Sequence, residues 1–284
     1  GLRRAAAADR RRRAAAPRSR AAPSVAWIST WNTKCGIASY SRHLIDNLGQ
    51  CTHVLAPFTD QHLETDAEWV HRCWDAAKPD GLDGVERTLN RIGPEGVVLQ
   101  FQYGFFEFAP LARLLKAQKE AGRVVVVMMH ATQDPEHVPE RRLSMLVDAL
   151  RNCDRILVHS VGDLNRLKVL GLVDNVAIFP HGIVDFDPAQ LPARNRGQRF
   201  QLASYGFCLP HKGLPELLEA VAILVGRGYD VGLHMVNAEY PVGESAALIA
   251  QLRERVASLG LADRIELQSA YLPEGESFAL LRTA

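Results

Sequence analysis

The chain has 284 residues, of which 47% are hydrophobic and 23% are charged, and this composition is typical of a globular protein large enough for two domains. The net charge of +1 hides an asymmetry. Residues 1–20 contain eight arginines and one aspartate, whereas the remainder carries 25 basic and 31 acidic residues. The mildly acidic remainder excludes a general nucleic-acid binder. No run approaches the roughly 20 apolar residues of a membrane span.

Residues 1–23 form a tail rich in Arg and Ala without apolar spacing, which predicts a disordered segment. A peripheral contact between these arginines and anionic lipid is the alternative role. The five scattered cysteines include no C-x-x-C pair, and they are typical of buried thiols in a reducing compartment. We therefore expect a cytoplasmic protein, with the inner face of the membrane as the other candidate location.

Strand and helix patterns alternate from residue 24 onward. In the first half, the sequence predicts strands at 24–30, 52–58, 97–102, 123–130, 155–159 and 175–180, and helices at 37–48, 85–92, 110–121, 143–152 and 161–170. Residues 60–83, rich in Trp, His and charge, allow no assignment. The apolar strands, with four consecutive valines from Val124 to Val127, favour a parallel sheet covered on both faces.

The alternation restarts after residues 185–198, which carry two prolines and little apolar periodicity and are typical of a linker. Beyond it we predict strands at 200–205, 231–236 and 264–268, helices at 214–227 and 245–259, and an unfinished helix from about residue 273. These patterns predict an α/β protein with two Rossmann-type doubly wound parallel-sheet domains, 24–184 and 199–284. The second is expected to be incomplete, because such sheets commonly have five or six strands.

The segment 203–213 is the most informative for chemistry. It reads as a strand, then a loop with Gly206, Lys212 and Gly213, then an apolar-periodic helix. We expect this arrangement to direct a helix N-terminus and the Lys212 ammonium toward one point, which suits a phosphate or diphosphate. Pro215 fits the first turn of that helix. An ordinary strand–helix connection with a solvated lysine is the alternative.

Further loops follow predicted strands, and open α/β sheets bind ligands at such ends. Gly36 permits a close backbone approach to a phosphate or a sugar hydroxyl. His130 follows the strongest strand and is a candidate to bind a sugar hydroxyl or to stabilise charge. His181 and Gly182 fit a tight turn where the first domain ends. A structural role is the alternative for each, and for Ser160 a helix cap is the prediction.

Several other chemistries find no support in the sequence. It contains no G-x-x-x-x-G-K-[ST] phosphate loop, no G-x-G-x-x-G after the first strand and no G-x-S-x-G elbow. The ten histidines show no H-E-x-x-H or comparable spacing, so we expect no metal site.

Six motifs in a fixed order carry a family resemblance. They are C-G-I-A-S-Y-S-R at 35–42, L-Q-F-Q-Y-G at 99–104, M-H-A-T at 129–132, V-H-S at 158–160, F-P-H-G-I at 179–183, and the 206–213 loop leading into L-L-E-A at 217–220. This ordered set resembles the retaining glycosyltransferases of family four, which have the two-Rossmann GT-B fold. The resemblance implies transfer of a sugar from a UDP- or GDP-linked donor to a glycan or lipid-linked acceptor, with retention and without a bound metal.

The resemblance also implies roles for single residues. The first domain would receive the acceptor and the second would bind the nucleotide. His130 and Lys212 would be the catalytic residues, with His130 beside the donor sugar and Lys212 paired with the diphosphate. The donor phosphate itself would take the acceptor proton. The donor-binding set would be Gly36, His181, Gly182, Gly206, Lys212 and Gly213.

Two departures qualify this expectation. Phe207 stands where the family commonly places an arginine, and the Glu, seven residues, Glu motif that holds the donor would lie beyond Ala284. We therefore expect a C-terminally truncated enzyme with weak or no activity. The alternative is a non-catalytic sugar- or nucleotide-binding module of a larger assembly. A sugar-nucleotide epimerase is a third hypothesis, against which the Pro-His-Gly and His-Lys-Gly loops argue.

Overall fold

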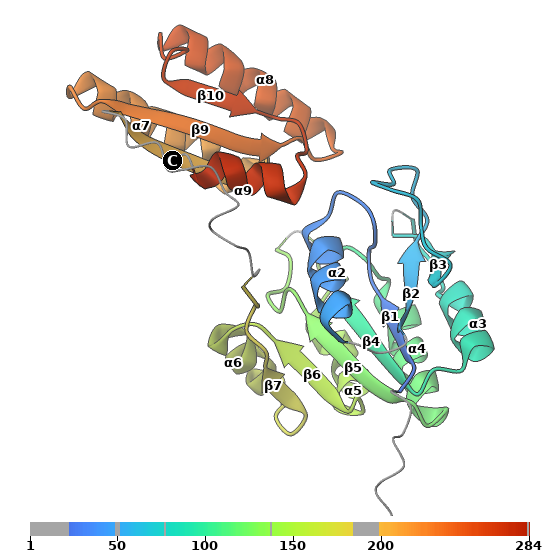
Figure 1. The fold of residues 1–284 in the computed structure, drawn as a ribbon. Helices are drawn as coiled ribbons and strands as arrows, with labels where there is room; N and C mark the ends of the chain where they lie inside the picture. The colour runs from blue at the N-terminus through green and yellow to red at the C-terminus, as the bar shows by residue number, and fades with distance from the viewer. Residues whose placement is uncertain (1–22, 49–51, 77, 137, 184–198, 283) are drawn as a thin grey trace, which may run out of the picture. The chain divides into compact units, whose positions relative to one another are not determined.

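The structure is a computed structural model that divides into two compact units, Gly1–Ile183 and Val184–Ala284 (Figure 1). The residues described are 23–48, 52–76, 78–136, 138–183, 199–282 and 284. The predicted linker 185–198 and residues 1–22 of the predicted tail lie outside them. Each unit contains its own parallel sheet.

The first unit is built on a seven-stranded sheet in the order β3-β2-β1-β4-β5-β6-β7, in which each strand runs parallel to its neighbours. Its strands are β1 Val25–Ile28, β2 Thr52–Pro57, β3 Val70–Trp74, β4 Gly96–Phe101, β5 Val124–Met129, β6 Arg155–Val158 and β7 Val176–Ile178. Its helices are α2 Gly36–Leu48, α3 Asp83–Ile92, α4 Phe108–Glu120, α5 Val147–Arg151 and α6 Val161–Val169, with a 3-10 turn at Leu143–Leu146 before α5.

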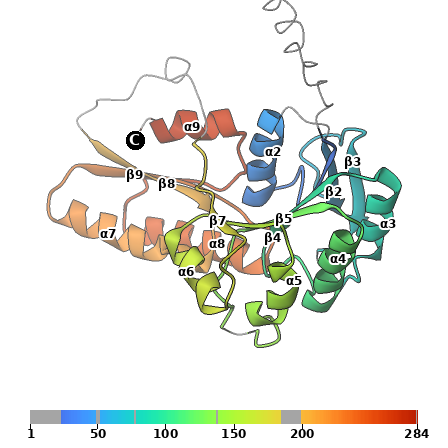
Figure 2. The same cartoon turned by 90° about the horizontal axis from the view of Figure 1, so that it is seen from below.

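Alternation along the strands divides the apolar side chains of this sheet between two cores. On β1, Ala26 and Ile28 belong to the larger core, whereas Trp27 belongs to a smaller one that includes Leu44 and Ile45 of α2. Figure 2 shows α2 on one face of the sheet and α3, α4, α5 and α6 on the other. The strand order reverses between β1 and β4, and in open α/β sheets ligands bind at the carboxyl ends of strands beside such a switch point.

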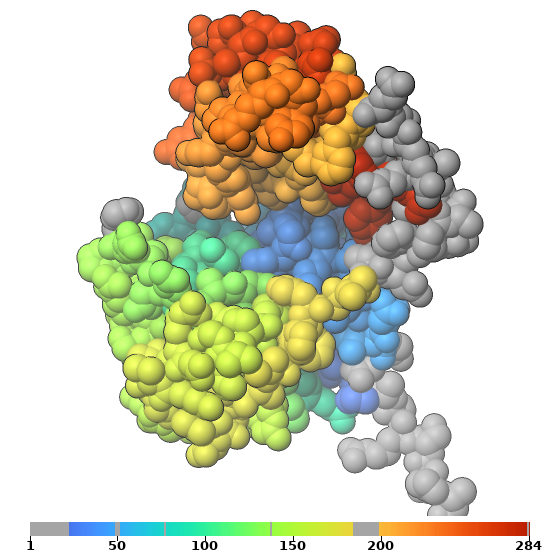
Figure 3. All heavy atoms as spheres, turned by 90° about the vertical axis from the view of Figure 1, so that its left-hand side faces the viewer, coloured from blue at the N-terminus to red at the C-terminus, as the bar shows by residue number. Residues whose placement is uncertain are grey.

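The second unit has a three-stranded parallel sheet in the order β10-β9-β8. Its elements are β8 Phe200–Phe207, a 3-10 turn Pro210–Lys212, α7 Leu214–Gly226, β9 Val231–Ala238, α8 Gly243–Ser258, β10 Ile265–Gln268 and α9 Glu274–Arg282. Helices α7 and α8 pack side by side on one face, and α9 covers the other (Figures 2 and 3). The prediction of three strands in this part is therefore confirmed within the described residues.

Two local predictions need correction, and one strand lies where the sequence allowed no assignment. The segment 143–152 is not one helix, because its first turn is 3-10 and only Val147–Arg151 is α-helical. The strand predicted at 175–180 is confined to Val176–Ile178. Strand β3 lies inside the unassigned region 60–83 and is an edge strand. It includes His71 and Arg72, so it lacks the continuous apolar run from which the other strands were predicted.

The cysteines only partly match the expectation of buried thiols. Of the cysteines in the described residues, Cys153 and Cys208 are buried, Cys35 and Cys73 are half-buried, and all four are free thiols. Cys51 lies outside the described residues. None of the helices in the described ranges is both long and apolar enough to cross a membrane.

Candidate functional site

Three histidines gather at the carboxyl ends of neighbouring strands in the first unit. His130 follows β5, His159 follows β6 and His181 lies beyond β7. Tyr40 of α2 contacts all three, with ring centroids 5.2 Å from His130, 5.5 Å from His159 and 5.1 Å from His181. The structure thus brings together two predicted site residues, His130 and His181, whose ring centroids are 6.4 Å apart.

The strand period places His130 on the face of the sheet that α2 covers. Val125, Val127 and Met129 of β5 belong to the larger core, so the next residue turns to the opposite face. Helix α2 is held against that face by apolar packing and by a buried contact of 2.9 Å between the hydroxyls of Ser29 and Ser41. Tyr40 is therefore positioned by the packing of its own helix.

The His130 imidazole is neutral at pH 7. Its Nε2 lies 2.7 Å from Oε1 of the buried Gln100, and in this arrangement the ring N–H donates to the amide oxygen. Burial, together with the neighbouring His159 and His181, lowers the pKa of His130 to about 4. With Nε2 carrying the proton, Nδ1 is an acceptor that suits a ligand hydroxyl.

Buried polar atoms without partners concentrate in this cluster. The Tyr40 hydroxyl, Nε2 of Gln100 and Nε2 of His159 are buried, and none has a hydrogen-bond partner among the described residues. His159 Nδ1 lies 2.8 Å from the carbonyl of Phe179, so that its Nδ1–H donates to the backbone. An unmet buried group costs about 1–3 kcal/mol. Such a concentration is typical of a site that holds ordered water or ligand hydroxyls.

The histidines do not form a metal site. Within the part of the chain that the structure describes, no group of three or more His, Cys, Asp or Glu side chains is arranged to hold a metal ion. The rings of His159 and His181 are stacked, with centroids 3.9 Å apart and planes inclined by 22°, so they face one another instead of converging their nitrogens on one point.

Gly36 lies where expected, but the tight turn predicted at His181 and Gly182 is wrong, because residues 179–183 run without a turn. Packing requires neither glycine. Gly36 is the first residue of α2, and Gly182 follows His181. A Cβ at either position would meet no atom within 4 Å. Ser160, predicted as a cap, does cap α6, since its hydroxyl accepts a hydrogen bond from the amide of Asp163.

In the second unit, the loop after β8 has the predicted strand–loop–helix form. Lys212 ends the 3-10 turn, Gly213 adopts φ 68°, and α7 begins at Leu214 with Pro215 in its first turn. No side chain caps α7. The exposed Lys212 ammonium has no hydrogen bond or ion pair with any described residue. Gly206, at φ 132°, occupies a backbone conformation that favours glycine.

The sequence did not reveal an aromatic cluster at the carboxyl ends of the second sheet. The ring of Phe207 lies 5.0 Å from that of Tyr240 and 6.2 Å from that of Tyr271, centroid to centroid. Nearby, at the position paired with Gly206, Asn237 is buried, and its Oδ1 has no partner among the described residues. An aromatic residue at or soon after the end of each of the three strands is the signal that could have found this cluster.

No family model matches the chain, and no curated protein matches its sequence. Solved structures do match. The HepE protein of Anabaena, in complex with UDP and glucose, is similar with a TM-score of 0.63 and 14% identity over 88% of this chain and 70% of that one. Sucrose-phosphate synthase from Thermosynechococcus elongatus gives a TM-score of 0.68 and 15% identity, over 92% of this chain and 73% of that one.

A third similar structure is a UDP-forming trehalose-phosphate synthase from Burkholderia xenovorans, in complex with glucose-6-phosphate. It gives a TM-score of 0.62 and 13% identity over 92% of this chain and 77% of that one. At such identities the likeness shows the fold, and it extends through both sheets. The predicted fold class is confirmed: this is an α/β chain with the GT-B fold.

Proposed function

We propose that the chain is a glycosyltransferase that moves a sugar from a UDP- or GDP-linked donor to a glycan or lipid-linked acceptor, with retention of configuration. The observation that carries the proposal is an exposed Lys212 without a partner among the described residues, next to the uncapped start of α7 in a chain with the GT-B fold. The similar HepE structure contains UDP, and the similar Burkholderia xenovorans synthase is UDP-forming. Both support a nucleoside diphosphate as the ligand.

In this proposal the second unit binds the leaving group. The first amides of α7 have no intrahelical acceptor, and the helix dipole favours negative charge at that end. The Lys212 ammonium adds a full charge, which offsets the charge that develops on the diphosphate as the sugar–phosphate bond breaks. Gly206 and Gly213 supply backbone conformations that let the chain approach the phosphates.

The first unit would orient the sugar and the acceptor. A neutral His130 accepts a hydrogen bond from a sugar hydroxyl through Nδ1, and its low pKa makes it unsuitable as a general acid at pH 7. The acceptor proton then passes to the donor phosphate as the leaving group departs, so the protein contributes mainly positioning and electrostatics. Gly36, His181 and Gly182 complete the proposed donor-binding set.

A second candidate is a non-catalytic module that binds a sugar or a nucleotide. One observation favours it. Phe207 packs against Tyr240 and Tyr271 at the place where a second phosphate-binding cation is expected, so this position offers an aromatic surface in place of a charge.

Sugar release separates the two candidates. The 284-residue chain is incubated with UDP-glucose or GDP-mannose, and proton NMR follows the free sugar and its anomeric configuration at the earliest times. Release of a sugar that first appears in the donor's own configuration supports a retaining transferase. Calorimetric binding of UDP or GDP without release supports the module. A chain that neither binds a nucleoside diphosphate nor releases sugar contradicts the transferase and the nucleotide-binding form of the module.

A further inference from the structure

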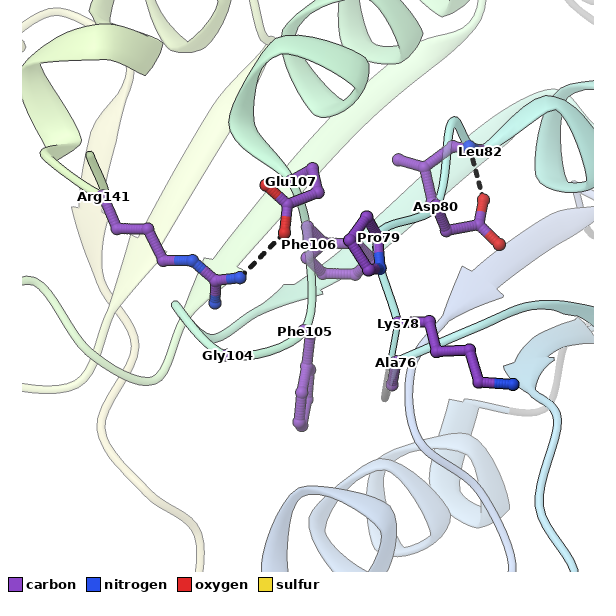
Figure 4. A pocket seen from close by; sticks show the side chains of 10 residues that line it. All are labelled: Ala76, Lys78, Pro79, Asp80, Leu82, Gly104, Phe105, Phe106, Glu107 and Arg141. Atoms are coloured by element: carbon purple, nitrogen blue, oxygen red, sulfur yellow. Dashed lines mark hydrogen bonds and ion pairs between the residues drawn. The ribbon is translucent and has the colours of Figure 1, made fainter. Parts of the chain in front are cut away.

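The first unit contains a cavity of about 160 Å³ that the donor proposal leaves unused. It lies between the loop that follows β3 and the loop that follows β4, at the carboxyl edge of the sheet (Figure 4). The β4 loop contributes residues 104–107, and Arg141 comes from the segment after β5. The β3 loop contributes Ala76, Lys78, Pro79, Asp80 and Leu82.

The wall formed by the β3 loop is held in place by its own hydrogen bonds. The Asp80 carboxylate accepts from the amide of Leu82 at 2.6 Å and from the amide of Asp75 at 2.8 Å. Leu82 is buried and has φ 62°, a left-handed conformation that costs a residue with Cβ about 1–2 kcal/mol. Strain of this kind persists where the surroundings enforce it, and it concentrates at binding sites.

The opposite wall is aromatic. Phe106 is buried and stacks on Trp74 with ring centroids 4.9 Å apart, and the Trp74 indole N–H donates to the carbonyl of Leu55 at 3.1 Å. Phe105 meets Phe106 edge to face at 6.1 Å and is only half-buried. Figure 4 shows its ring projecting from the loop. A fixed aromatic base with one partly exposed ring is a ready surface for the C–H face of a ligand.

An ion pair supplies polar groups at one end of the cavity. Arg141 donates to the Glu107 carboxylate at 2.8 Å and to the carbonyl of Tyr103 at 2.6 Å. A guanidinium has five N–H donors and a carboxylate has two oxygens, so both groups retain capacity for further hydrogen bonds. Figure 4 shows the Lys78 side chain extending away from this pair.

We infer that this cavity binds one neutral pyranose unit of the acceptor, an inference that rests on the proposed transferase function. A sugar ring combines an apolar C–H face, which suits Phe105, with hydroxyls that both donate and accept, which suit the Arg141–Glu107 pair. The volume is below the roughly 300–1,000 Å³ of pockets for drug-sized ligands, so a single ring fits better than an oligosaccharide. A neutral sugar is favoured over an anionic one because Arg141 is already paired with Glu107.

Saturation-transfer NMR on the full 284-residue chain tests the inference. The probes are D-glucose, D-galactose, D-mannose and N-acetyl-D-glucosamine, with sorbitol as the open-chain control. We expect at least one pyranose to bind and sorbitol not to bind. Phe105→Ala and Glu107→Gln should each weaken that binding about tenfold. Phe58→Ala, which removes an aromatic ring that is 60% exposed elsewhere in this unit, should leave it unchanged.

Glucose 6-phosphate is added as an anionic probe. The inference is overturned if no neutral pyranose binds, if Phe105→Ala and Glu107→Gln bind as the parent does, or if only glucose 6-phosphate binds. Melting temperatures of the variants verify that each one folds. UDP titrations on the same samples keep the two proposals separate. UDP binding without pyranose binding refutes the sugar pocket alone, whereas pyranose binding without nucleotide binding refutes the donor proposal and leaves the pocket standing.

Discussion

His130 and Gln100 form a short hydrogen bond, Nε2 to Oε1 at 2.7 Å, between the end of β5 and the neighbouring strand β4. Gln100 is fully buried and alternates with Leu99 and Phe101 of the larger core, so its carboxamide lies on the opposite face, the one that α2 covers. The bond orients the imidazole and directs its free Nδ1 away from Gln100.

The low pKa of His130 predicts a pH dependence of stability. Its native pKa of about 4 lies below the ordinary value near 6.5, so between these pH values the unfolded chain binds more protons than the native one. The stabilisation is present above about pH 6.5 and is lost as pH falls toward 4, by up to roughly 3 kcal/mol. Urea unfolding from pH 7 to pH 4.5 measures it. A His130→Asn variant should show a flatter pH profile, and an identical profile contradicts the assigned pKa.

Replacing Gln100 tests its role as a positioning residue. Gln100→Met keeps the shape of the side chain but removes the acceptor for the His130 N–H, which should cost about 1–3 kcal/mol of unfolding free energy. Nitrogen-15 NMR of the imidazole should show a changed tautomer ratio, which a packing defect alone does not produce. An unchanged tautomer ratio in a folded variant means that the Gln100 contact does not set the protonation of His130.

Two substitutions at Tyr40 separate the contribution of its hydroxyl to stability from that of its ring. It is buried without a partner among the residues described, so Tyr40→Phe should leave the melting temperature unchanged or raise it slightly. Tyr40→Ala, which also removes the ring that contacts three histidines, should cost about 3 kcal/mol or more. A large loss of stability in Tyr40→Phe means that the hydroxyl has a structural partner.

Arg72 provides a test that does not involve His130, His159 or His181. It donates twice to the Asp66 carboxylate, at 2.8 and 3.0 Å, and also to the carbonyls of Pro57 and Trp31. Arg72→Lys cannot reproduce this planar fork and should cost about 1–3 kcal/mol. Arg87→Lys is the matched control, because Arg87 is exposed and has no hydrogen bond or ion pair with the described residues. Equal stability of the two variants contradicts the structural role of Arg72.

The fold was largely predictable because its strands are apolar and continuous. The valine run of β5 and the strand–helix alternation identify a parallel sheet, since only strands buried on both faces read this way. Strand β3 was not predicted because it lies at the sheet edge, where His71 and Arg72 replace core residues. The 3-10 turn at Leu143–Leu146 was not distinguished from an α-helix, because a single turn of either has nearly the same apolar spacing.

The candidate site was predictable only in part. His130, His181 and Lys212 were named as candidates from their positions after strands, which parallel topology brings to one edge of each sheet. Tyr40 and Gln100 belong to two of the sequence motifs, but no role was predicted for them. The contact of a helix with a strand end depends on register and packing, which periodicity does not specify. The pocket beside Phe105 and Glu107 was missed for the same reason: its walls come from loops after β3 and β4, which are not adjacent strands.

Calorimetric titration of Lys212→Gln with UDP and with UMP tests the central claim most directly. The side chain is exposed and unpartnered within the described residues, so the variant should keep the parent melting temperature. We predict that it binds UDP about tenfold or more weakly, through loss of a charge-assisted contact, and that UMP affinity changes less. Lys116→Gln, an exposed lysine of α4, is the control and should bind UDP as the parent does. Equal UDP affinity of parent and Lys212→Gln would contradict the account.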